Sequence, residues 1–528
     1  MAAVIRSVEV TSVGLLLARL PLIPFRAIDL DEYEHAHAAW SVAHGLLPYR
    51  DFFEHHPPAV YLLFAPIFAG SRPAIDPVHA LQAIEAARGA MWLFAIASVA
   101  IVYDLAEVLH NRLAAAIAAL LLATSIQFLM STLEFRPDVA AVFLLLVCIS
   151  LLLDRSPARL PISQEPRLVM AGVAFGTALL FTQKAIFAAP GIGLALLLTR
   201  KLRPAMVFAI GAVLPIAITL LWFRRQGALA PLWYYTVTFN ARLNADGFSP
   251  WPRLLSNLIQ QPAIYLLGLG ALVLTLEVNL AEFLGGTRWR TAITARDPSR
   301  LDNETRPHSE HAHRLAAAAL RLVPPIHLAK RSPKHRFAPH PFAFLGCHPA
   351  IIVLPALSLI AGIFIIGRSY DQYYALLLPL LAILGGSLAV DLLETLRQRP
   401  AIVLGVVMAA TVEIHQVTFI RSVKPIDPQV EELTYATTHL NQTDSYIGGS
   451  PGSALFRPHA WFYFFLTGAF ASDRDWAELT DAIQSGRLQP RIVIRDRYLE
   501  QRAPAALLAY LDAHYRQAVG DIYLRQSE

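Results

Sequence analysis

The chain has 528 residues, of which 55% are hydrophobic and only 16% are charged. Soluble proteins usually carry about 25% charged residues, so this composition excludes an ordinary soluble protein and indicates that lipid surrounds many apolar segments. The formal net charge of +5 does not indicate a nucleic-acid partner, because the basic residues gather in alternate loops, as in proteins oriented across a membrane.

Long apolar runs predict helices that cross a bilayer, since about 20 such residues span its hydrocarbon core. Thr182-Gln183-Lys184 separates two short runs, which favours a tight re-entry over one long helix. The first run has no small-residue cleavage site after it and is interpreted as a retained anchor. Cys148 and Cys347 border apolar runs, so no disulfide framework is expected. We predict about eleven spans: residues 8–26, 88–108, 113–131, 138–153, 168–182, 185–199, 204–223, 262–284, 349–367, 374–391 and 400–417.

The charge of the loops predicts the orientation of these spans. More than half of the Arg and Lys residues before residue 418 lie in loops that we therefore assign to the cytoplasm, namely 154–167, 200–203, 285–348 and 392–399. The basic loop 285–348 could lie on the anionic leaflet. The opposite side carries the acidic loop 27–87, in which residues 30–44 have helical spacing after a cap at Asp29 or Asp31. Pro57-Pro58 then opens an apolar segment at 59–70 that is too short to cross and suits the interface.

The character of the chain changes after residue 417. Charged helices are expected near 428–440, 475–486 and 503–515, and short strands near 444–449, 490–495 and 519–525. The expected fold is therefore a polytopic α-helical membrane domain, residues 1–417, followed by a small extracytoplasmic α/β domain, residues 418–528.

The acidic run from Asp29 to Glu34 is the strongest candidate for chemistry. Clustered carboxylates can take a proton from a hydroxyl group, bind a cationic substrate, or hold Mg²⁺ or Mn²⁺. Asp31 and Glu32 are the candidate ligands for such an ion. A solvated acidic face of the loop is the alternative.

The pattern around this run resembles the first outer loop of GT-C glycosyltransferases, in the branch that includes protein O-mannosyltransferases and lipid A aminoarabinose transferases. These enzymes move a sugar from a polyprenyl-phosphate carrier to an acceptor outside the cytoplasm. The resemblance covers residues 1–417 in topology, and its motifs lie within residues 26–62: Asp31-Glu32, Gly45, Pro48-Tyr49-Arg50-Asp51 and His56-Pro57-Pro58.

The resemblance implies roles for residues of the first loop. Asp31 falls on the position of the catalytic base, with Asp29 as the reserve candidate, and Glu32 completes an Asp-Glu pair like that of the mannosyltransferases. His56 stands where the aminoarabinose transferases place a lysine that contacts the carrier phosphate. The histidine departs from the family pattern, and unlike lysine it is only partly charged near neutral pH.

Five residues of other outer loops complete the candidate site. Asp138 is the candidate second carboxylate, and Arg136 is a candidate partner of the phosphate. The alternative is a turn in which both residues only anchor the chain at the membrane interface. Lys184 could bind the carrier phosphate or extend to the membrane surface. Arg368 and Tyr370 precede a late span, where Arg368 could bind the phosphate and the tyrosine could equally belong to an interfacial aromatic belt.

Together these features predict an inverting glycosyltransferase of the bacterial inner membrane. Its partners would be a polyprenyl-phosphate sugar donor, membrane lipid, and an extracytoplasmic acceptor that is a lipid, a glycan or a protein, with no nucleic acid. Mg²⁺ or Mn²⁺ is the only candidate cofactor. The alternatives are a flippase or transporter of a lipid-linked sugar, which would place charges deep within its spans, and a non-catalytic membrane scaffold.

Overall fold

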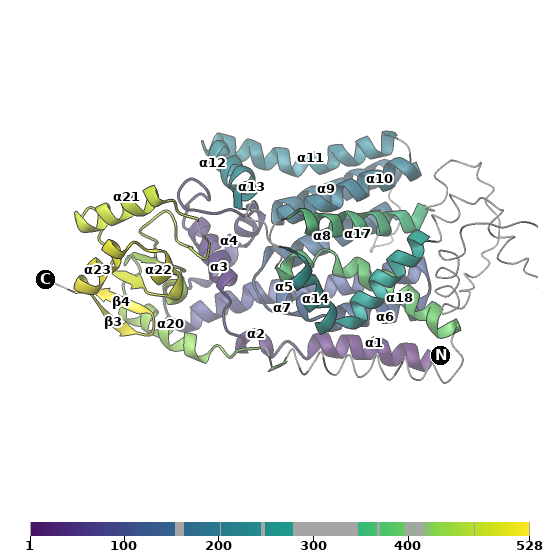
Figure 1. Ribbon diagram of the computed structural model, residues 1–528, viewed down its shortest axis with the longest axis horizontal. Coiled ribbons are helices and arrows are strands. Elements are labelled where there is room, and N and C mark those ends of the chain that lie inside the picture. The colour runs from purple at the N-terminus through teal and green to yellow at the C-terminus, as the bar shows by residue number, and fades with distance from the viewer. Residues whose placement is uncertain are drawn as a thin grey trace, which may run out of the picture.

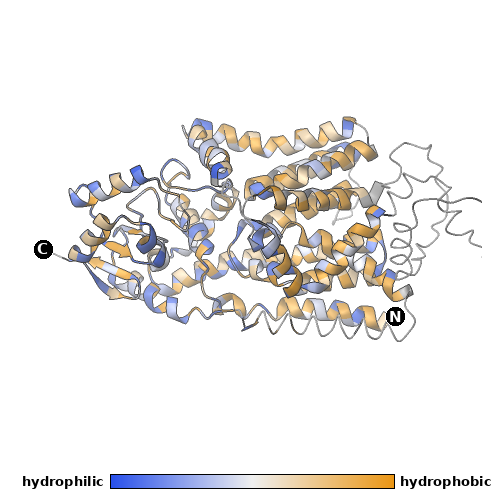
Figure 2. Ribbon diagram, viewed as in Figure 1, coloured by the Kyte–Doolittle hydropathy of each residue, from blue (hydrophilic) through white to orange (hydrophobic). Residues whose placement is uncertain are grey.

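A computed structural model describes residues 2–153, 163–200, 202–243, 249–277, 347–366, 370–395, 423–468 and 470–526, with five further positions between 405 and 421. Long apolar helices lie side by side along its long axis, and a small sheet with its helices lies at the end away from the N-terminus (Figure 1). Hydrophobic residues dominate the long helices, whereas polar residues are more frequent around the sheet (Figure 2).

In the helical part, helices pack against their neighbours in sequence and also against helices that lie far away in sequence. Helix α9 packs between α8 and α11, α6 packs against α5 and α18, and α10 packs against α17. The elements are α1 (Ala2–Leu17), α2 (Leu22–Phe25), α3 (Leu30–Ala43), α4 (Ala59–Ser71), α5 (Pro77–Leu109), α6 (Arg112–Thr124), α7 (Ile126–Thr132), α8 (Pro137–Leu152), α9 (Gln164–Phe181), η1 (Gln183–Ala188), α10 (Ala189–Arg200), α11 (Leu202–Arg225), α12 (Leu229–Trp233), the π-helix η2 (Tyr234–Phe239), α13 (Asn240–Leu243), α14 (Trp251–Gln260), α17 (Cys347–Ile365), η5 (Asp371–Tyr373) and α18 (Leu378–Thr395).

The described residues allow a limited comparison with the predicted spans. Three helices there are long and apolar enough to cross a membrane, at Ala2–Phe25, Pro77–Leu109 and Leu202–Arg225. Two bent pairs raise this number to five: α6 with α7, bent by 65°, and α14 with Pro262–Glu277, bent by 114°. Shorter apolar helices occur at the predicted spans 138–153, 185–199, 349–367 and 374–391, and α9 lies at the predicted span 168–182. Most of the predicted span 400–417 and the loop 285–346 lie outside the described residues, so the count of eleven stays a prediction.

Two of the breaks between apolar helices bear on the predicted spans, and one of these two was expected. Helix α9 ends at Phe181, and Thr182 is extended (φ −146°) before η1 begins, so the interruption at Thr182-Gln183-Lys184 is confirmed. The other break divides the predicted span 113–131 at Ser125, whose hydroxyl donates to Gln261 Oε1 at 2.6 Å. This buried hydrogen bond joins two polar side chains at the bend inside the helical part.

The C-terminal part contains a four-stranded sheet in the order β1-β2-β4-β3. Strands β1 and β2 are parallel, and the other two pairings are antiparallel. Strand β3 was not predicted, because the expected helix 503–515 ends at His514 and the chain continues directly as a strand. The elements are α20 (Asp427–His439), β1 (Tyr446–Gly448), η6 (Gly452–Ala454), α21 (Asp473–Gln484), β2 (Ile492–Ile494), α22 (Arg497–Arg502), α23 (Ala505–His514), β3 (Tyr515–Val519) and β4 (Ile522–Arg525).

The first loop, residues 27–76, lies between the helical part and the C-terminal part. Helix α3 begins with Asp29 as its cap, because the Asp29 carboxylate accepts from Asp31 N at 3.1 Å and the Glu32 carboxylate accepts from Asp29 N. The helix is followed by Gly45 at φ +86°, a conformation that favours glycine. On the other side, Phe53 N donates to Phe462 O at 2.8 Å and His37 Nδ1 lies 2.7 Å from Leu455 O. The C-terminal part therefore helps to hold the loop.

Candidate active site

The N-terminus of α3 and the turn before α8 meet through Arg136. Its guanidinium donates to Asp31 Oδ2 at 2.7 Å and to Asp29 Oδ1 at 2.6 Å, and it also contacts the Glu134 carboxylate. The Asp31 side chain is 34% exposed, whereas the Arg136 side chain is largely buried. The structure thus brings together Asp31, Arg136 and the reserve candidate Asp29, and leaves one face of the Asp31 carboxylate open to a substrate.

The electrostatic surroundings of Asp31 favour its ionised form. Burial alone would raise the pKa of this carboxyl group, but the charges of Arg136, His56 and Lys184 hold the pKa below its usual value. A carboxylate that is ionised at neutral pH can accept a proton, as a general base must.

Glu32 is the neighbour of Asp31 in sequence but faces another part of the protein. Its carboxylate is fully buried and forms a two-point ion pair with Arg88, at 2.8 Å to Nε and 2.6 Å to Nη2. It also accepts from Phe135 N at 2.9 Å. Arg88, in α5, donates further to the carbonyl groups of Ile23 and Arg26. Both oxygens of Glu32 are therefore occupied, which favours a role in holding α3 over metal binding or direct catalysis.

A second ion pair joins two other predicted residues. Lys184 Nζ, in η1, lies 3.0 Å from Asp138 Oδ1 in the first turn of α8, and both side chains are largely buried. The same ammonium group stands 4.7 Å from the centre of the Tyr373 ring. Lys184 thus has an anionic and an aromatic partner within the protein, and the interpretation as a lysine that merely extends to the membrane surface loses its support.

In the late loop, Tyr370 and its neighbour Tyr373 differ in their contacts. The Tyr370 ring is exposed and contacts the Tyr373 ring edge-on at 5.8 Å, rather than the charged residues. Tyr373, which the sequence did not single out, is the tyrosine beside Lys184. Arg368 lies outside the described residues.

His56 belongs to a cluster of its own. Its Nδ1 lies 2.9 Å from Glu54 Oε1, and Glu34 and His55 lie beside this pair. Burial, together with the charges of Glu54 and Asp31, raises the pKa of Glu34 well above its usual value. The sequence analysis included Glu34 in the acidic run but assigned no individual role to Glu34, Glu54 or His55. The signal that could have found them is the run of three metal-ligating residue types at 54–56, together with Glu34 one helical turn after Asp31.

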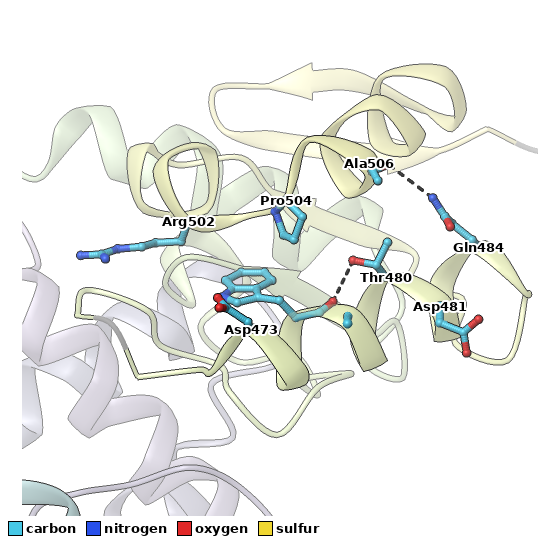
Figure 3. Close-up of a pocket in the computed structure, with 9 residues that line it drawn as sticks. Asp473, Thr480, Asp481, Gln484, Arg502, Pro504 and Ala506 are labelled. Carbon is cyan, nitrogen blue, oxygen red and sulfur yellow. Dashed lines mark hydrogen bonds between the residues drawn. The ribbon is translucent and has the colours of Figure 1, made fainter. Parts of the chain in front are cut away.

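A groove of about 570 Å³ lies elsewhere, in the C-terminal part. Its walls are formed by α21 and by the segment around α22 and α23, including Asp473, Trp476, Arg502 and Pro504 (Figure 3). None of the predicted site residues lines it.

Comparisons with known proteins agree with this arrangement. The family described as dolichyl-phosphate-mannose-protein mannosyltransferase matches residues 79–223, a range that includes Arg88, Arg136, Asp138 and Lys184. No curated protein sequence matches the chain. The crystal structure of ArnT from Cupriavidus metallidurans bound to undecaprenyl phosphate superposes over 98% of this chain and 97% of its own, with a TM-score of 0.53 and 13% identity.

The chain has the fold of the GT-C superfamily. A further structure with this fold, the apo form of the Archaeoglobus fulgidus oligosaccharyltransferase, superposes over 94% of this chain and 70% of its own, with a TM-score of 0.50 and 12% identity. The resemblance inferred from residues 26–62 is thereby confirmed at the level of the fold, and the chain is a helical membrane protein. At these identities the likeness concerns the fold alone, so the reaction follows only from the geometry of the site.

Proposed function

We propose that this GT-C protein is an integral membrane glycosyltransferase, which moves a sugar from a polyprenyl-phosphate donor to an extracytoplasmic acceptor with inversion. The observation that carries the proposal is the open Asp31 carboxylate beside Arg136, with the Lys184–Asp138 pair on a neighbouring outer segment. Sugar transfer of this kind needs a carboxylate base and cations for the leaving phosphate. The complex of ArnT with undecaprenyl phosphate supports a donor of this chemical class.

In the proposed reaction, Asp31 accepts the proton of the acceptor hydroxyl group while the hydroxyl oxygen attacks the anomeric carbon. The bond between that carbon and the phosphate oxygen breaks, and the polyprenyl phosphate leaves with the bonding electron pair. Arg136 and Lys184 stabilise the charge that develops on the phosphate, with Arg368 and Tyr370 as further candidates from the late loop. Asp138 orients Lys184, and Glu32 positions α3 through Arg88.

The residues support the proposed location in the membrane better than they support a bound divalent ion. Basic loops on one side and this acidic site on the other support a bacterial inner membrane with the site, and the part after residue 418, facing outward. Mg²⁺ or Mn²⁺ at Asp31 and Glu32 has less support, because Arg88 and Phe135 N occupy the Glu32 oxygens. No step of the reaction is assigned to a metal ion.

The decisive experiment measures transfer of labelled sugar from a panel of polyprenyl-phosphate donors in membranes. Asp31→Asn removes the base and is expected to reduce transfer by about 10²–10⁴-fold. Asp76→Asn is the matched control, since Asp76 lies in the same loop, is paired with His79, and caps α5 in a way that asparagine can replace. Movement of intact lipid-linked sugar across the bilayer, without cleavage of the sugar–phosphate bond, would instead support a flippase.

A further inference from the structure

Four metal-ligating side chains converge next to the Asp31–Arg136 contact. Glu34 belongs to α3, and Glu54, His55 and His56 follow one another in the first loop. Each offers one oxygen or nitrogen atom, and these atoms all lie within 4.8 Å of one another. Two segments of the first loop thus share one cluster of potential ligands.

Four of the six separations within the cluster, those between a carboxylate Oε1 and a histidine Nδ1, lie near the values of a tetrahedral site. Glu34 Oε1 lies 3.6 Å from His55 Nδ1 and 3.8 Å from His56 Nδ1. Glu54 Oε1 lies 3.8 Å and 2.9 Å from the same two nitrogen atoms. A tetrahedral zinc ion with ligand bonds of about 2.0–2.2 Å separates its ligand atoms by about 3.3–3.6 Å. The four observed distances bracket this range, so small side-chain adjustments would complete the coordination.

Two buried carboxylate oxygens in this cluster lack a hydrogen-bond partner within the described part of the chain, namely Glu34 Oε1 and Glu54 Oε2. The Glu34 side chain is 1% exposed and the Glu54 side chain is fully buried. Two carboxylates buried side by side are unfavourable unless a cation or a proton compensates them. Two imidazole nitrogens together with two carboxylates suit zinc, whereas Mg²⁺ and Ca²⁺ prefer oxygen ligands alone.

Neighbouring groups orient these ligands from behind. Glu54 Oε1 accepts from the backbone N–H groups of His55, at 2.8 Å, and His56, at 2.9 Å. The His35 ring packs edge-on against the His56 ring at 5.1 Å. Contacts of this kind fix the direction of metal ligands in proteins.

We propose that Glu34, Glu54, His55 and His56 bind one zinc ion, which fastens the loop before α4 to helix α3. Four protein ligands close the tetrahedral set, so the ion has a structural role. With Nδ1 bound to the metal, the His56 ring keeps its proton on Nε2 and remains a hydrogen-bond donor. The test of this site measures bound metal and not sugar transfer. Its outcome is therefore independent of the proposed transferase activity.

The test uses the full chain without a histidine tag, purified in detergent, stripped with a chelator, loaded with Zn²⁺ and dialysed. Mass spectrometry of the metal is expected to find one zinc per wild-type chain. Glu34→Gln keeps the shape of the side chain but removes its charge, and a drop of at least tenfold in bound zinc is expected. His79→Asn is the matched control, because His79 also pairs with a carboxylate, Asp76, but lies outside the cluster, and it should retain one zinc.

Two results would overturn the proposal. One is that folded wild-type protein retains no zinc after loading. A proton shared by Glu34 and Glu54 would then be the charge that compensates the two buried carboxylates. The other is equal zinc in wild type and Glu34→Gln, which would locate the ion elsewhere. If Glu34→Gln does not fold, X-ray absorption of the wild-type protein decides, since the proposal requires a shell of four nitrogen and oxygen atoms at about 2.0–2.2 Å. A sulfur atom or six ligands in that shell would contradict it.

Discussion

At the scale of single residues, the site depends on which carboxylate faces which cation. Asp31 and Glu32 are adjacent in sequence, yet one contacts Arg136 and the other contacts Arg88. Successive helical residues point about 100° apart, so the two side chains could not both face one site. The sequence identified the residue types and indicated a cap at Asp29 or Asp31, of which Asp29 is the one observed. It could not identify Arg88 as the partner of Glu32, because local patterns do not report contacts between residues 56 positions apart.

Replacing Glu32 should affect folding more than chemistry. Glu32→Ala leaves the buried Arg88 guanidinium without its carboxylate, which typically costs about 3–5 kcal/mol of stability. Thermal unfolding in detergent should therefore show a large loss for Glu32→Ala and a small one for Asp31→Asn. A Glu32→Ala protein with unchanged stability and no transfer would instead assign Glu32 to catalysis.

The Lys184–Asp138 pair allows a test by charge removal. Lys184→Met leaves the buried Asp138 carboxylate unpaired, and a loss of about 3 kcal/mol is expected. Adding Asp138→Asn should recover most of the stability but none of the transfer activity, because the cation for the phosphate is still absent. Stability that falls further in the double variant would show that the two residues do not compensate each other.

At the scale of elements, close backbone contacts hold the helices together. A side chain at Gly172, Gly176 or Gly211 would overlap backbone atoms of the facing helix, so α9 and α11 approach closely through small residues. The sequence predicted both helices and the break before η1. It did not predict the bend at Ser125, since an apolar run continues through it and the stabilising partner, Gln261, is distant in sequence.

Replacing glycine by alanine should destabilise the protein at this helix contact but not at a glycine that faces open space. Gly176→Ala is expected to lower the thermal unfolding temperature and the yield of folded protein, because the new Cβ would overlap Ala212 O in α11. Gly193→Ala, in α10, meets nothing within 4 Å and should leave both unchanged. Equal behaviour of the two variants in detergent would argue against the close approach of α9 and α11.

At the scale of the whole molecule, the C-terminal part is packed onto the first loop. His37 Nε2 and His459 Nδ1 lie 2.9 Å apart across this contact, beside the Tyr446 hydroxyl group. Burial lowers the pKa of His459 to about 4, although Asp51 acts in the opposite direction. The sequence predicted α20, α21 and α23 and three of the four strands here, but not the short helix α22. It gave no sign of this contact, which depends on residues more than 400 positions apart.

The contact should weaken in acid. Because the pKa of His459 is lower in the folded state, the unfolded chain binds the proton first, and stability falls as the pH decreases from about 6.5 towards 4. The loss is of order 1–2 kcal/mol, given the partial exposure of the ring. His459→Asn should flatten this slope in thermal unfolding measured against pH. An unchanged slope would assign the acid sensitivity to other groups, His37 first.

The hydrogen bond from Phe53 N to Phe462 O has a consequence for the timing of synthesis. The first loop emerges from the ribosome early, but the segment that completes its packing is translated about 400 residues later. Until then Phe53 and its neighbours have no partner from the C-terminal part. The nascent chain would therefore enter the membrane before this contact exists, and chains that terminate early would lack the contact altogether.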